Sequence, residues 1–152
     1  MHSAILFAPG LYASGQPTID DLAALASAGV RSVINLRAAD EQIDYDEASE
    51  AERLGLSYTW LPIAGPDAVT AEAAACLAGV LDQARMQGDV LIHCASSNRV
   101  GALIALDRGI AQGAPRDEAL AIGRAAGMTS LEPLVTRLLD QQFDTNSTVA
   151  AE

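Results

Sequence analysis

The feature that most restricts the fold of this chain is a short apolar run at residues 90–93, followed after a short loop by a second apolar run at 99–112. The first run is too short and too continuously apolar for anything but a central parallel strand. The second run has the length and character of a helix. A strand, a tight loop and a helix in this order are typical of an α/β fold, in which helices flank a mostly parallel sheet.

The rest of the sequence agrees with such a fold, because strand and helix patterns alternate up to residue 93 and helix patterns alone follow. We expect the other strands at 4–7, 11–13, 32–36 and 56–60, and the other helices at 18–28, 45–54, 70–87, 115–126 and 130–143. Thr18 and Asp21 form a candidate capping box, and Gly29 and Gly55 are candidate helix stops. The prediction is one domain over residues 1–143, with a sheet of about four to five strands, and a flexible tail at 144–152.

The composition narrows the possible partners and the compartment. With 152 residues and a net charge of −11, the chain lacks the basic surface that nucleic acid or an anionic membrane requires of a partner. No apolar run is long enough to span a bilayer, and residues 1–10 lack the basic start of a signal peptide. We therefore expect a cytoplasmic protein, in which the two cysteines are not a disulfide scaffold.

Cys94 and Arg99 stand at the two ends of the loop between the central strand and the following helix, with four residues between them. The start of a helix offers unpaired backbone N–H groups and a positive dipole end, and both favour thiolates and phosphate-like anions. Arg99 adds a planar fork that can hold two oxygens of one anion. We therefore predict a nucleophilic Cys94 and an anion-binding loop, with the Ser96 and Ser97 hydroxyls donating to the cysteine or the ligand. The loop residues are Ala95, Ser96, Ser97, Asn98 and Arg99.

A thiolate that attacks a phosphate ester needs an acid to protonate the leaving oxygen. Asp67 is the first candidate, because it lies in a proline-rich loop after the strand at 56–60, at the same edge of the sheet as Cys94. Asp40 and Glu41 are alternatives for the same reason, since they follow the strand at 32–36.

Three further residues have expected roles outside the chemistry. His93 precedes the cysteine on the strand, so its side chain should face away from Cys94 and support the loop through a hydrogen bond to its backbone. Cys76 lies on an apolar stripe of the helix at 70–87 and is expected in the core. The two histidines and two cysteines have no metal-ligand spacing, so we expect neither a metal nor another cofactor.

His93-Cys94 and Arg99 after a short apolar strand resemble the signature of cysteine-based protein tyrosine and dual-specificity phosphatases. The segments at 12–17 and 29–37, together with Glu41, resemble more specifically a bacterial family of beta-lactamase hydrolase-like proteins, which contain small phosphatase-like domains. The likeness extends from about residue 11 to about residue 106.

The resemblance implies a cysteine-phosphatase fold and hydrolysis of phosphomonoesters through a phosphocysteine. Cys94 would be the nucleophile, Arg99 the phosphate-binding residue and Asp67 the acid. Phosphorylated proteins or small phosphomonoesters would be substrates, and phosphate, sulfate or vanadate would bind in the loop. The sequence leaves open the choice between phosphotyrosine, phosphoserine or phosphothreonine and non-protein substrates, and it leaves the oligomeric state open.

The chain departs from the usual phosphatase pattern at three points. Typical tyrosine phosphatases have five residues between cysteine and arginine, whereas this chain has four. Val100 stands where a Ser or Thr hydroxyl usually helps the thiolate to leave, so turnover of a phosphocysteine is expected to be slow. Ser97 stands where similar sequences tend to carry Gly, and a positive φ there would cost about 1 kcal/mol.

Two other functions fit parts of the pattern. Many rhodaneses, which transfer sulfur through a persulfide, also have four residues between cysteine and arginine, but their chains continue with a further strand, whereas here helix patterns follow Leu103. The shortened loop and Val100 also fit a weak or inactive module that binds phosphate or senses redox state. The intact Cys94 is an argument against this second alternative, since a pure binder needs no thiol.

Overall fold

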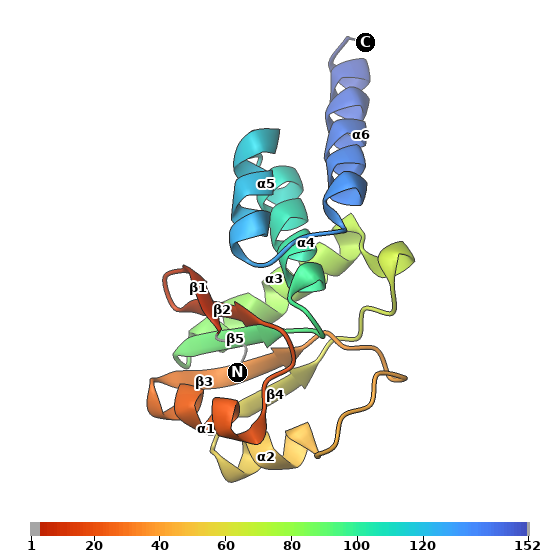
Figure 1. Ribbon diagram of the computed structural model, residues 1–152. Helices are drawn as coiled ribbons and strands as arrows, with labels where there is room; N and C mark the ends of the chain where they lie inside the picture. The colour runs from red at the N-terminus through yellow and green to blue at the C-terminus, as the bar shows by residue number, and fades with distance from the viewer. Residues whose placement is uncertain (1–3, 152) are drawn as a thin grey trace.

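A five-stranded sheet with strand order β1-β2-β5-β3-β4 forms the middle of the molecule (Figure 1). The computed structural model describes the backbone of residues 4–151 and the side chains of residues 4–142. The strands are β1 (Ile5–Ala8), β2 (Leu11–Ser14), β3 (Val30–Asn35), β4 (Ser57–Trp60) and β5 (Asp89–His93). The helices are α1 (Ile19–Ser27), α2 (Glu47–Arg53), α3 (Ala71–Arg85), α4 (Asn98–Leu106), α5 (Arg116–Ala125) and α6 (Glu132–Ala151), with a 3₁₀ turn at Pro66–Ala68 and a π-helical turn at Asp107–Ala111.

The sheet is parallel except at one edge. β5 pairs in parallel with β2 on one side and β3 on the other, β4 pairs in parallel with β3, and only β1 runs antiparallel to its neighbour β2. The expected central strand is therefore confirmed. Because β2, β3, β4 and β5 point the same way, the loops that leave them meet at one edge of the sheet.

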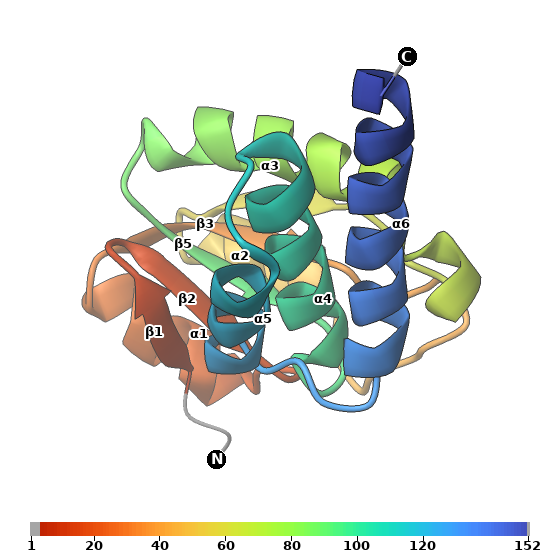
Figure 2. The same ribbon diagram turned by 90° about the horizontal axis from the view of Figure 1, so that it is seen from above.

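Helices cover both faces of the sheet: α1 and α2 lie on one face, and α3, α4, α5 and α6 on the other (Figures 1 and 2). Alternate residues of β5 supply the two cores, since Leu91 packs with Leu22 of α1, whereas Ile92 packs in the cluster that contains Leu103 of α4. All three β5 residues from 90 to 92 are buried, as a central strand requires.

Each expected element is present, and apart from the end of α6 the boundaries differ from the expected ones by at most two residues when the π-helical turn is counted with α4. The capping box at α1 is confirmed, with both of its hydrogen bonds between Thr18 and Asp21. The α6 backbone continues to Ala151, through the segment that was expected to be a tail. Residues 1–3 and 152 lie outside the described residues, and the domain limits stay a prediction.

The expectation for Cys76 was wrong, because its side chain is exposed on α3. The buried face of this helix consists of Ala74, Leu77 and Leu81, which follow one another at helical spacing. Cys76 lies on the neighbouring, solvent-facing side. Within residues 4–151, no helix is both long and apolar enough to cross a membrane.

Candidate active site

The loop after β5 begins with a buried cysteine. Cys94 follows the strand directly, has no exposed surface, and donates its backbone N–H to the Ser14 carbonyl oxygen of β2 at 3.4 Å. α4 begins at Asn98, so Arg99 lies in the first turn of that helix, where the backbone N–H groups have no acceptor inside the helix. The structure thus brings Cys94 and Arg99 to the same loop at the carboxyl edge of the sheet.

The Arg99 guanidinium has fixed partners on three of its five N–H groups. Nη1 donates to Glu41 Oε2 at 2.6 Å and to the Ile63 carbonyl oxygen at 3.0 Å, and Nη2 donates to Glu41 Oε1 at 2.6 Å. The Nε–H and the second Nη2–H, which lie side by side on one edge, remain for a ligand. That edge is the bidentate fork with which arginine holds two phosphate oxygens.

Glu41 is the carboxylate that orients Arg99. The hydrogen bonds from Arg99 lower the pKa of Glu41, against the opposing effect of partial burial. The same bonds, followed by the charge of Cys94, raise the pKa of Arg99 against desolvation. A carboxylate that is held ionised in this way is a poor proton donor, so the contact argues against Glu41 as the acid.

The β2–α1 turn contacts one side of the loop. Gly15 forms a β-bridge with Ser96, and Gln16 N–H donates to the Ala95 carbonyl oxygen at 3.2 Å. A Cβ atom on Gly15 would lie only 2.7 Å from that carbonyl oxygen, so the close approach requires glycine.

The α5–α6 turn, residues 126–131, contacts the other side of the loop and lies beside the start of α4 (Figure 2). The Ser97 hydroxyl donates to the Ala126 carbonyl oxygen at 2.7 Å, and Asn98 Oδ1 accepts from Thr129 N–H at 2.7 Å. Asn98 Nδ2 donates to the Ser130 hydroxyl at 2.8 Å. These side chains therefore hold the loop from outside, and the expectation that Ser97 donates to the cysteine or to a ligand was wrong.

Ser97 is also the only residue other than glycine with a positive φ in the described part of the chain, at 70°. Gly127 makes room for its side chain, because a Cβ on Gly127 would lie 2.4 Å from Ser97 Oγ. The positive φ that was suspected at this position is thus confirmed. The Ser97 backbone is strained in this conformation, whereas a glycine would adopt it without strain.

A buried charged network lies beneath the loop on the β2–α1 side. Glu47, which is 4% exposed, accepts from His93 Nε2 at 2.5 Å and from Gln16 Nε2 at 2.8 Å, and it pairs with Arg37 Nη2 at 3.5 Å. Burial by itself raises the pKa of Glu47, but His93, Gln16 and Arg37 lower it more, so the net shift is downward. His93 Nδ1 lies 3.4 Å from the Cys94 carbonyl oxygen, which is the expected contact with the loop backbone.

The two other candidates for the acid, Asp67 and Asp40, lie nearer to solvent. Asp67 is exposed in the 3₁₀ turn after β4 and makes no hydrogen bond within the described residues. It belongs to the same β4–α3 connection as Ile63, whose carbonyl contacts Arg99. Asp40 is exposed on the loop before Glu41. Val100, in contrast, is fully buried in α4.

Sequence reasoning missed the network around Glu47. Gln16 and Arg37 lie in the segments at 12–17 and 29–37 that carry the family resemblance, so they offered a signal. Glu47 offered none, because a glutamate in the first turn of a polar helix is usually exposed. Among the residues that the structure describes, no group of three or more His, Cys, Asp or Glu side chains could hold a metal ion.

Comparison with known proteins supports the resemblance. Beta-lactamase hydrolase-like proteins from two strains of Xylella fastidiosa are 36% identical over 136 residues, which cover 87% of this chain but only 31% of theirs. The chain thus spans less than a third of the length of these relatives.

Solved phosphatase structures share the fold. A phosphatase candidate from Neisseria meningitidis has a TM-score of 0.72 and 25% identity, covering 88% of this chain and 94% of its own. P. aeruginosa TpbA, solved in complex with phosphotyrosine, has a TM-score of 0.68 and 22% identity, covering 91% of this chain and 87% of its own.

The family model described as "DSP-PTPase phosphatase fused to NAD+ Kinase" matches residues 7–138. The chain therefore belongs to this family of dual-specificity and tyrosine phosphatase-like domains.

Proposed function

We propose that this protein hydrolyses phosphomonoesters through a phosphocysteine at Cys94. The observation that carries the proposal is the free edge of Arg99, which Glu41 and Ile63 leave available beside Cys94 at the start of α4. An anion on that edge would also meet the unpaired N–H groups of the first turn of α4. The substrate would be a phosphorylated protein or a small phosphomonoester.

In the first step the Cys94 thiolate attacks phosphorus, an S–P bond forms, and the bond from phosphorus to the leaving oxygen breaks. Arg99 and the loop amides stabilise the negative charge on the three other oxygens. In the second step water attacks the phosphocysteine, which releases inorganic phosphate and the thiolate.

Asp67 is the proposed acid for the first step and the base for the second. The position of Asp67 supports this role, because Asp67 lies in the β4–α3 connection, and the Ile63 carbonyl oxygen of the same connection accepts a hydrogen bond from Arg99. As a carboxylic acid it would protonate the leaving oxygen, and as a carboxylate it would then accept a proton from the attacking water. The proposal therefore requires this connection to close over the loop when substrate binds.

Val100 sets the expected speed of the second step. Its buried side chain offers no hydroxyl to the leaving thiolate, so hydrolysis of the phosphocysteine is expected to limit the rate. Sulfur transfer by a rhodanese-like mechanism is the less favoured alternative, because the elements that follow the loop are helices throughout the described residues, where rhodaneses continue with a strand.

The test is the hydrolysis of para-nitrophenyl phosphate at mildly acidic pH by the wild type and by Cys94→Ser, with Cys76→Ser as the matched control. Cys76 is exposed on α3, so its replacement should leave turnover unchanged, whereas Cys94→Ser should abolish it. Arg99→Lys, which keeps the charge but loses the fork, should lower kcat/KM by roughly 100-fold.

Vanadate-sensitive turnover that disappears in Cys94→Ser would establish the proposed chemistry. Equal losses for Asp67→Asn on activated and on poor leaving groups would remove Asp67 as the acid, because an acid matters most for poor leaving groups. If the wild type shows no turnover, the phosphatase proposal fails. Sulfur transfer from thiosulfate to cyanide, and then phosphate binding without turnover, would be measured next.

A further inference from the structure

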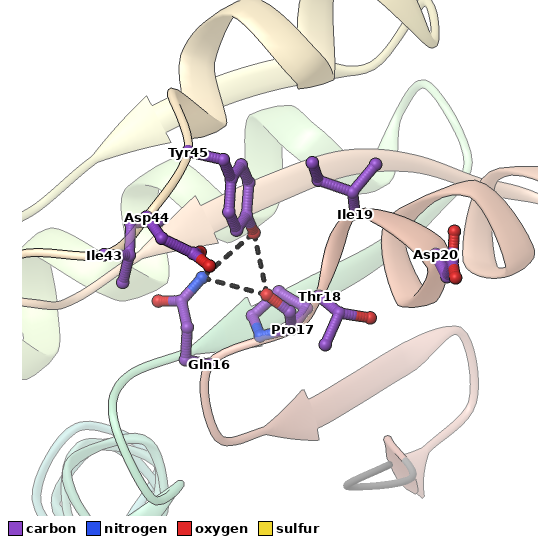
Figure 3. A pocket seen from close by; sticks show the side chains of 8 residues that line it. All are labelled: Gln16, Pro17, Thr18, Ile19, Asp20, Ile43, Asp44 and Tyr45. Atoms are coloured by element: carbon purple, nitrogen blue, oxygen red, sulfur yellow. Dashed lines mark hydrogen bonds between the residues drawn. The ribbon is translucent and has the colours of Figure 1, made fainter.

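A pocket of about 560 Å³ lies between the start of α1 and the segment that leads into α2, with walls from residues 16–20 and 43–45 (Figure 3). The Tyr45 ring stands in it with Ile19 on one side and Ile43 on the other. The Tyr45 hydroxyl donates to the Pro17 carbonyl oxygen at 2.7 Å and accepts from Gln16 Nε2 at 3.1 Å. Because these bonds fix the ring, the apolar wall of the pocket is formed before any ligand arrives.

The Tyr45 hydroxyl is a neutral part of this wall. Burial, and then the negative charge of Glu47, raise the pKa of Tyr45 to about 12. The hydroxyl therefore keeps its proton at neutral pH, and its two hydrogen bonds persist.

The pocket adjoins the loop that carries Cys94. Gln16 lines the pocket, and its backbone N–H donates to the Ala95 carbonyl oxygen at 3.2 Å. The next residue back, Gly15, pairs with Ser96. A phosphate held by the loop would thus have this pocket as its neighbour on the β2–α1 side.

The pocket carries two carboxylates without partners. Asp20 and Asp44 line it on opposite sides of Tyr45 (Figure 3), both are exposed, and neither takes part in a hydrogen bond or ion pair in the part of the chain that the structure describes. The nearby arginines do not offset them, since Arg37 pairs with Glu47 and Arg99 with Glu41. A cation that enters this pocket would meet negative charge on both sides, whereas an anion would be repelled.

We infer that this pocket selects phosphopeptides that carry a lysine or arginine next to the phosphorylated residue. The inference rests on the proposed function, because it names the substrate class of the same site. The aliphatic stem of such a side chain would pack against the wall formed by Ile19, Ile43 and the Tyr45 ring, and its charged end would lie in the negative field of the two carboxylates. The net charge of −11 adds a long-range attraction for basic peptides.

The test compares two phosphotyrosine peptides of equal length, one with lysines and one with glutamates on both sides of the phosphotyrosine. At about 10 mM salt, where screening is weak, kcat/KM should favour the lysine peptide by roughly tenfold. The double variant Asp20→Asn with Asp44→Asn should remove most of that preference, and the small remainder would come from the long-range attraction of the net charge. The control Asp82→Asn removes one exposed carboxylate from α3, on the opposite face of the sheet, and should keep most of the preference.

Para-nitrophenyl phosphate separates this inference from the proposed function. If the wild type hydrolyses that ester but treats both peptides alike, the inference is wrong and the function stands. If it hydrolyses no ester, the function fails, and the binding of both peptides to Cys94→Ser decides about the pocket. Tighter binding of the lysine peptide that is lost in the double aspartate variant would support the inference, and equal binding would overturn it.

Discussion

The loop between Cys94 and Arg99 is held from two sides by different kinds of contact. On the β2–α1 side, a buried and charged network beneath it joins Glu47 to His93 and Arg37. On the α5–α6 side the contacts are neutral: the Ser97 hydroxyl donates to the Ala126 carbonyl oxygen, Asn98 Oδ1 accepts from Thr129 N–H, and Gly127 approaches Ser97 closely. The first support depends on charge and therefore on pH, whereas the second depends on steric fit and backbone conformation.

This difference shows how the two supports can be broken separately. A buried charge that loses its partner costs several kcal/mol, because the remaining charge is out of water without compensation. A neutral hydrogen bond contributes only about 1 kcal/mol, but a misplaced atom in a tight contact has no room to move.

The largest effect should come from Glu47→Gln, which keeps the shape of the side chain and removes its charge. Arg37 and His93 then lose their shared anion, so the free energy of unfolding should fall by about 3 kcal/mol. Urea denaturation would measure the loss. Glu52→Gln, on the exposed side of the same helix, is the matched control and should change stability by less than about 0.5 kcal/mol. Equal effects of the two substitutions would mean that the network contributes nothing to stability.

The pH dependence of stability should reveal the same charged support. Because the pKa of Glu47 in the folded protein lies below its ordinary value of 4.5, the ionised carboxylate contributes stability that is complete above pH 4.5. That contribution is lost as the pH falls through the lower folded value. The wild type should therefore lose stability more steeply than Glu47→Gln below pH 4.5, and their difference should shrink. Parallel curves from denaturation at each pH would contradict this assignment.

The sequence was sufficient to predict the strand–loop–helix arrangement, because short apolar runs, capping residues and glycine stops are local signals. It also placed Cys94 and Arg99 together, since both flank one short loop. It did not reveal that Arg99 takes Glu41 as its partner, which is 58 residues away, or that Glu47 is buried against His93, 46 residues away. Such contacts depend on how whole elements pack. The error on Cys76 had a local cause: Ala74, Leu77 and Leu81 define the buried face, and Cys76 lies just outside it.

On the α5–α6 side, Gly127→Ala should have the next largest effect. Its φ is 106°, and an added Cβ would lie 2.5 Å from Ser97 Cβ, so the free energy of unfolding should fall by about 2 kcal/mol. Gly113→Ala is the control for backbone strain alone, because its φ is 73° and no atom lies within 4 Å of the added Cβ. In a Ser97→Gly background, Gly127→Ala should cost less, since the clash is gone. Undiminished cost in that background would show that the contact with Ser97 is not the cause.

The smallest effect should come from Ser97→Gly, because two changes oppose each other. Glycine relieves the strain of a positive φ, worth about 1 kcal/mol, but the Ala126 carbonyl oxygen loses its donor, at a similar cost. The free energy of unfolding should therefore stay within about 1 kcal/mol of the wild type. Ser97→Ala separates the two terms, since it keeps the strain and loses the hydrogen bond, and it should be the less stable of the two variants in the same urea titration. If Ser97→Ala were as stable as the wild type, the bond to Ala126 would carry no stability, and the α5–α6 turn would hold the loop through Asn98 and steric fit alone.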